Sequence, residues 1–81
     1  MANPIPFPER VAAELRSEMA YQQRTLTQMA EALKLDRKAT KLRYDGVKPM
    51  TLAEIETLAR WLDVELGRLL LSARAVEAVA S

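Results

Sequence analysis

The sequence predicts an all-α protein that folds as a compact bundle of five helices. Apolar residues recur at intervals of three and four through most of the 81 residues, which is the period of amphipathic helices. Only two glycines occur, and alanine and leucine are abundant, so the composition favours helix over sheet. Capping patterns divide the chain into short segments. A chain of this length is expected to form one domain with a small core.

The N-terminal part predicts an extended arm followed by a first helix. Residues 1–8 hold three of the four prolines, so we expect them to form the arm. The helix should begin near Pro8, a residue suited to the first helical turn, and end around Gln22 or Gln23. Its expected buried stripe consists of Val11, Leu15 and Met19.

The next two predicted helices are short and lie on either side of a tight turn. Thr25, with Gln28 three residues later, forms a capping box for the second helix. Asp36 is a suitable N-cap for a third helix, and Gly46 is a suitable residue to end it. In the turn, Lys34 occupies a place where glycine would relieve a left-handed backbone conformation, at a cost on the order of 1 kcal/mol.

Two further helices are predicted in the second half of the chain. Thr51 and Glu54 form another capping box, and the helix that follows should run to about Asp63. Its expected inner face consists of Leu52, Ile55, Leu58, Ala59 and Leu62. A fifth helix should start near Glu65. Residues 72–81 are expected to be a helical extension or a frayed tail.

The cations are concentrated in one part of the chain. The net charge of the whole protein is +1, yet residues 34–48 hold six of the twelve Lys and Arg against two Asp. A local net charge of +4 is typical of a surface that contacts phosphate. The alternative for an isolated charge run is a solvated helix face, and composition does not distinguish the two.

Composition argues against several other classes of protein. The chain has no His and no Cys, which removes the commonest general base and the thiolate metal ligands. It also lacks a glycine-rich phosphate loop, so we expect no enzyme activity, no metal and no cofactor. The first ten residues contain no apolar run, and no run approaches the roughly 20 residues that span a bilayer. We therefore expect no membrane association and a cytoplasmic, nucleoid-associated location in a bacterial host cell.

Three segments together carry a family resemblance. They are LTQMAEALKLDRKAT at 26–40, the terminating Gly46, and MTLAEIETLARWLDV at 50–64. In this order and spacing they resemble the phage repressor and Cro family of helix-turn-helix proteins, over residues 9–71. The resemblance implies a lambda-repressor-like DNA-binding domain in which the second and third helices form the helix-turn-helix. The third helix would then enter the major groove of double-stranded DNA.

The resemblance also implies a set of DNA-contacting residues. Those at the start of the second helix would meet phosphate, and those on the exposed face of the third helix would reach base edges. Leu42 could offer only apolar contact, for instance to a thymine methyl group. The implied set is Thr27, Gln28, Arg37, Lys38, Lys41, Leu42, Arg43 and Lys48.

The inner face of the third helix has two interpretations. The spacing of the motif turns Thr40 and Tyr44 toward the core. Simple periodicity counted from Leu35 would instead turn Ala39 and Leu42 inward and leave Tyr44 exposed. In the second case Tyr44 would be a contact to DNA.

The implied function is sequence-specific regulation of transcription by a phage or prophage repressor that binds a palindromic operator as a homodimer, with no small-molecule ligand. The candidate dimer residues are Trp61, Leu71, Val76 and Val79. Trp61 has a second interpretation, as a partly buried cover over the first or fifth helix. The alternative function is an antitoxin-type module on the same scaffold, which would occlude a partner toxin and regulate its own operon.

Overall fold

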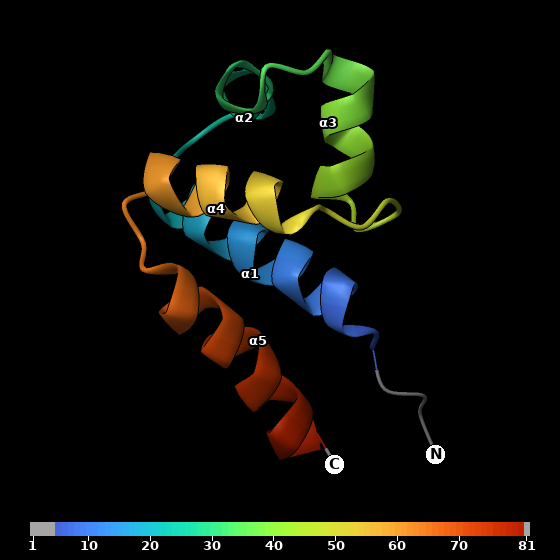
Figure 1. Ribbon diagram of the computed structural model, residues 1–81, viewed down its shortest axis with the longest axis vertical. Coiled ribbons are helices and arrows are strands. Elements are labelled where there is room, and N and C mark those ends of the chain that lie inside the picture. The colour runs from blue at the N-terminus through green and yellow to red at the C-terminus, as the bar shows by residue number, and fades with distance from the viewer. Residues whose placement is uncertain (1–4, 81) are drawn as a thin grey trace.

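The computed structural model describes residues 5–80, with side chains described up to residue 74. These residues form five α-helices and no strand, which confirms the predicted fold class. The helices are α1 (Phe7–Tyr21), α2 (Leu26–Leu33), α3 (Arg37–Tyr44), α4 (Leu52–Trp61) and α5 (Leu66–Ala80). Figure 1 shows α1 and α4 in the middle of the molecule, α5 on one side of them, and α2 and α3 together at the opposite end.

Polar caps begin the three middle helices where the sequence predicts them. Both capping boxes form: Thr25 with Gln28 at the start of α2, and Thr51 with Glu54 at the start of α4. At the start of α3, the backbone N–H of Ala39 donates to Oδ1 of Asp36 at 2.7 Å. These bonds satisfy amide groups that a helix cannot pair internally, so each helix has a fixed first residue.

The core lies between α1, α2, α4 and α5. The predicted stripe of α1 is fully buried, and Leu58 and Leu62 are almost inaccessible to solvent. The buried cluster consists of Val11, Leu15, Met19, Met29, Ile55, Leu58, Leu62, Leu69 and Ala73. Leu52 departs from the prediction because 63% of it is exposed, so the inner face of α4 starts at Ile55.

The structure decides between the two orientations of α3. Thr40 is completely buried, and Tyr44 is half-buried and packs against the core. Leu42, by contrast, is exposed. The motif spacing therefore predicts the inner face of α3 correctly, and the periodicity counted from Leu35 does not.

Two turns around α3 need unusual backbone conformations. Lys34 ends α2 with φ 58° and ψ 40°, which is the left-handed region predicted for this position. Gly46 follows α3 with φ 77°, and a side chain there would also approach Glu9 and Ala12 of α1 at about 3.5 Å. These distances are ordinary contacts, so it is the left-handed conformation at the end of α3 that favours glycine here.

A buried arginine connects α5 to α1. Arg10 is only 6% exposed, and its Nε donates to the backbone carbonyl of Ala73 at 3.1 Å. Its guanidinium also donates to the carbonyl of Ile5. Helix α5 continues to Ala80, while residues 1–4 of the predicted arm and Ser81 lie outside the described residues. Within the described residues, no helix is both long enough and apolar enough to cross a membrane.

The left-handed residue in the α2–α3 turn provides a stability test. Lys34→Gly should raise the free energy of unfolding by about 1 kcal/mol, because glycine adopts this conformation without the steric cost of a Cβ atom. Thermal or denaturant unfolding followed by circular dichroism measures the change. Lys34→Ala is the matched control, since it removes the same charge and keeps the Cβ atom. A glycine variant no more stable than the alanine variant would contradict the prediction.

Candidate nucleic-acid interface

The outer face of α3 is cationic and open to solvent. Arg37, Lys38 and Lys41 are all exposed, and Leu42 on the same helix is 38% exposed. Thr40 is the buried residue of α3, so the helix keeps these four side chains in contact with solvent. In Figure 1, α3 stands at the edge of the molecule and no other helix covers its outer side.

Among these four side chains, Lys41 forms an ion pair within the described part of the chain. Its Nζ lies 3.0 Å from Oδ1 of Asp45, and both side chains are largely exposed, at 54% and 40%. The Nζ also lies 5.3 Å from the centre of the Tyr44 ring. An exposed pair of this kind contributes about 0–1 kcal/mol. Lys41 could therefore exchange Asp45 for a stronger anion at little cost.

The start of α2 supplies two further exposed side chains, Thr27 and Gln28. Thr27 has no role in the cap, whereas Oε1 of Gln28 accepts the backbone N–H of Thr25 at 2.8 Å. This bond fixes the Gln28 side chain over the first turn of α2. The positive end of the helix is a favourable position for an anion. Thr27 and Gln28 thus border a place where phosphate could bind.

The loop after α3 brings one more cation to the same end of the molecule. The backbone N–H groups of Val47 and Lys48 both donate to the carbonyl of Leu42, at 3.0 and 3.1 Å. These bonds fold the loop back onto the end of α3. The side chain of Lys48 is exposed there, as the prediction of a phosphate contact requires.

Arg43 differs from the other seven residues of the implied set. Its side chain is only 11% exposed, and its Nε lies 2.9 Å from Oε2 of Glu54 in α4. A second nitrogen, Nη1, donates to the carbonyl of Ala39 at 2.8 Å. The structure therefore turns Arg43 toward α4, while the rest of the set is exposed.

Two residues at this site make contacts that the sequence does not indicate. Glu54 is predicted only as part of a capping box, yet it also holds Arg43. Arg16 of α1 donates from Nη1 to the carbonyl of Tyr44, the last residue of α3, at 2.7 Å. Both contacts join residues far apart in the chain, and no local pattern marks such pairs.

The candidate dimer residues lie in different environments. Trp61 is half-buried against the core, and the guanidinium of Arg24 lies 5.1 Å from the centre of its ring. This position fits its interpretation as a cover over the core. Leu71 on α5 is 65% exposed. The side chains of Val76 and Val79 lie outside the described part of the chain.

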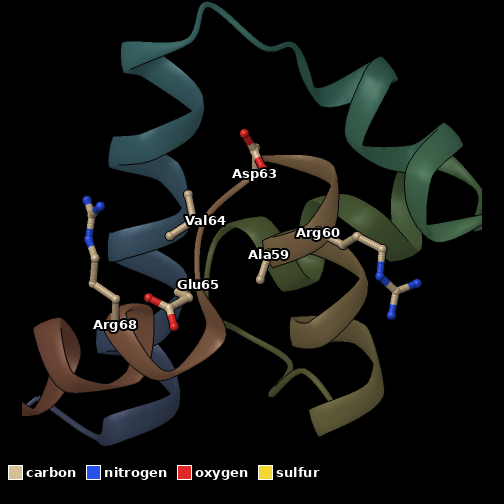
Figure 2. A pocket seen from close by; sticks show the side chains of 6 residues that line it. All are labelled: Ala59, Arg60, Asp63, Val64, Glu65 and Arg68. Atoms are coloured by element: carbon tan, nitrogen blue, oxygen red, sulfur yellow. The ribbon is translucent and has the colours of Figure 1, made fainter.

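Two surface depressions are lined by residues outside α3. One, of about 420 Å³, lies at the α4–α5 turn and is lined by Ala59, Arg60, Asp63, Val64, Glu65 and Arg68. Figure 2 shows the two arginine side chains pointing in opposite directions, away from a common centre. The other is an apolar groove of about 300 Å³ between the starts of α1 and α4 and the side of α5. Among the described residues, no group of acidic side chains is placed to hold a metal ion.

Comparison with known proteins supports the fold. No protein-family model and no curated protein matches the sequence. Among solved structures, the chain is similar to the clp gene regulator ClgR from Corynebacterium glutamicum, with a TM-score of 0.86 and 22% sequence identity. The alignment covers 96% of this chain and 83% of that chain. The likeness shows a shared five-helix fold, and membership of the phage repressor and Cro family stays a prediction.

Proposed function

We propose that this protein is a regulator of transcription that binds double-stranded DNA in a sequence-specific manner. In the proposed complex α3 enters the major groove, and α2 lies across the sugar-phosphate backbone. The observation that carries the proposal is the outer face of α3, where Arg37, Lys38, Lys41 and Leu42 are exposed while Thr40 is buried.

The proposed contacts divide by chemistry. Arg37 can donate two hydrogen bonds to the O6 and N7 of a guanine, whereas lysines supply positive charge to phosphates and bases. Thr27 and Gln28 would contact the backbone near the start of α2, and Lys48 would contact it beyond the end of α3. Leu42 would meet a thymine methyl group. These residues are the exposed members of the set that the family resemblance implies.

Two further arguments support a regulatory role, and the family resemblance is what implies a repressor of phage or prophage origin. The structural neighbour ClgR is named as a gene regulator, which agrees with a regulatory use of the shared fold. A small domain that covers its operator can exclude other proteins from that DNA by occupancy alone. Because fold does not determine function, these arguments need a direct test on DNA.

We further propose that the protein binds a palindromic operator as a homodimer. One subunit has only a few cations with which to contact phosphate, whereas two subunits would roughly double both the contacts and the salt dependence. Half-sites one helical turn apart, about 34 Å, would match a twofold-symmetric dimer. Leu71 is the candidate for its interface among the described side chains, because it is exposed on α5 and apolar.

Selection of duplexes from a random pool tests the proposal without knowledge of the operator. The purified protein should enrich a defined, twofold-symmetric sequence over several rounds. Footprinting on DNA that flanks its own gene should then protect a matching site. Enrichment of no sequence, with equal affinity for all duplexes, would overturn the proposed function.

The cations of α3 should determine both affinity and its dependence on salt. Arg37→Ala combined with Lys41→Ala should abolish binding to the selected duplex and leave the helical content unchanged, because both side chains are exposed. At low salt, where residual binding is measurable, the slope of log affinity against log salt should fall by about 0.9 for each phosphate that the variant no longer neutralises.

The matched control for this variant is Arg60→Ala combined with Arg68→Ala. These two exposed cations lie at the α4–α5 turn, which Figure 1 shows at the end of α4 remote from α3. The control removes the same charge and should keep most of the affinity. Equal losses in the two double variants would indicate general charge attraction and would contradict a role for α3 in base recognition.

The proposed dimer predicts a specific effect at Leu71. Leu71→Glu should convert the dimer to a monomer in sedimentation velocity, because it places a charge in an apolar interface. Operator affinity should fall at the same time. Leu52→Glu is the control, since Leu52 is an equally exposed leucine, at 63% against 65%, on another helix. An unchanged association state in the Leu71 variant would exclude this part of α5 as the interface.

A further inference from the structure

We propose that Arg43 and Glu54 are positioning residues, which set the orientation of α3 for base recognition without touching DNA. The inference rests on the proposed function, because it assumes that α3 contacts double-stranded DNA. It assigns to Arg43 a role different from that of the other residues in the implied set. It also gives Glu54 a role beyond its helix cap.

Helix α3 has little apolar surface with which to fix its orientation. Among its eight residues, all of which the structure describes, Thr40 alone is fully buried, and Tyr44 is the half-buried aromatic that packs against the core. A single buried threonine anchors one point of a helix, but it does not prevent the helix from tilting about that point. Polar contacts at the C-terminal part of α3 therefore add to this packing in defining its angle.

The ion pair between Arg43 and Glu54 is built to supply such a contact. Oε2 of Glu54 accepts from Nε of Arg43 at 2.9 Å, while Oε1 accepts from the backbone N–H of Thr51 at 2.9 Å. The cap fixes the carboxylate to the start of α4. The bond from Arg43 to the carbonyl of Ala39 fixes the guanidinium along α3. Each side chain thus has a second partner on its own element, so the pair joins two defined points.

Burial distinguishes this pair from an ordinary surface ion pair. The side chains of Arg43 and Glu54 are 11% and 19% exposed. Arg60 and Glu56, which pair within α4, are 76% and 56% exposed. Exposed pairs are screened by water and salt, whereas partly buried pairs are screened much less. The Arg43–Glu54 pair can therefore hold its geometry under conditions in which the Arg60–Glu56 pair exchanges with solvent.

Helix α1 holds α3 from another side. Arg16 donates to the carbonyl of Tyr44 at 2.7 Å, and its guanidinium lies 5.8 Å from the centre of the Tyr44 ring. The C-terminal part of α3 is thus attached to α1 through Arg16 and to α4 through Arg43. Base recognition tolerates errors of roughly 0.5 Å in the placement of contact groups, so attachment at two points matters for specificity more than for attraction to DNA.

Glu54→Gln separates positioning from electrostatics. Glutamine is accepted in a capping box, so its carbonyl oxygen can still accept the N–H of Thr51. Its amide group cannot act as a second carboxylate oxygen toward Arg43. Simple electrostatics predicts that the loss of a negative charge near phosphate strengthens DNA binding. The positioning role predicts a different result. The affinity for the selected duplex should fall relative to the affinity for other duplexes.

The experiment compares Glu54→Gln, Arg43→Met and the double variant with the wild-type protein. The matched controls are Glu56→Gln and Arg60→Met, which make the same changes in the exposed pair of α4. The probes are the duplex selected from the random pool and a shuffled duplex of equal composition. Each protein is titrated on both duplexes over a series of salt concentrations, and circular dichroism confirms that it is folded at the assay temperature.

We expect both single variants to lose about tenfold in the ratio of affinities for the selected and shuffled duplexes, which corresponds to about 1.4 kcal/mol. The double variant should lose no more than either single variant, because both remove the same contact. The salt slope of Arg43→Met should equal that of the wild type, because the residue does not touch phosphate. The two controls should keep the wild-type ratio.

Other outcomes would overturn the proposal. If Arg43 itself contacts bases, Arg43→Met loses discrimination while Glu54→Gln keeps it. If Arg43 contacts phosphate, the salt slope falls by about 0.9 in Arg43→Met. Should Arg43→Met unfold below the assay temperature, Glu54→Gln decides alone, since it keeps the cap. If the wild-type protein prefers neither duplex, the proposed function itself is refuted. If the wild-type protein discriminates and Glu54→Gln discriminates equally well, only the positioning role is refuted.

Discussion

The burial of Thr40 is the constraint on which the presentation of α3 depends. Its side chain is completely buried, and its hydroxyl donates to the carbonyl of Asp36 at 2.8 Å, so no polar atom is left without a partner. Successive residues of a helix are about 100° apart around its axis. A rotation of α3 by one position would therefore turn Lys41 toward the core, where an unpaired ammonium group is strongly unfavourable. The cationic side chains of α3 remain exposed because the small Thr40 is the residue of this helix that can be buried.

The parts of the fold that were predicted correctly are those encoded locally. A capping box involves residues three positions apart, so Thr25 and Thr51 could be assigned from the sequence alone. The phase of α3 could not be obtained by counting from Leu35, because Leu35 lies in the turn, before the extended residue Asp36 that caps α3. Leu52 has the right spacing for the inner face of α4, but it is the first residue of that helix. Its side chain leans toward the helix start and lines the rim of the apolar groove instead of reaching the core.

In the candidate site, too, the features that depend on local sequence could be predicted, and those that depend on long-range contacts could not. Exposure of Arg37, Lys38 and Lys41 follows from the charge of a short helix whose inner residue is known. The environment of Arg43 does not, because its partner Glu54 lies eleven positions away on another helix. In the sequence Arg37 and Arg43 belong to the same run of cations. Only the position of α3 beside the start of α4 distinguishes the exposed Arg37 from Arg43, which pairs with Glu54.

The two groups of charges around α3 differ in how they respond to salt. In the proposed complex with DNA, counterions compete directly for phosphate, so contacts from exposed cations such as Lys38 and Lys48 would weaken steeply as the salt concentration rises. The Arg43–Glu54 pair is largely shielded from solvent, and the Arg16 bond is made to a backbone carbonyl, so both are screened less. Rising salt would then reduce attraction to all DNA before it disturbs the angle of α3. In the proposed complex, nonspecific attraction would therefore weaken first, because it depends on exposed charge, while the geometry for base recognition depends on partly buried contacts.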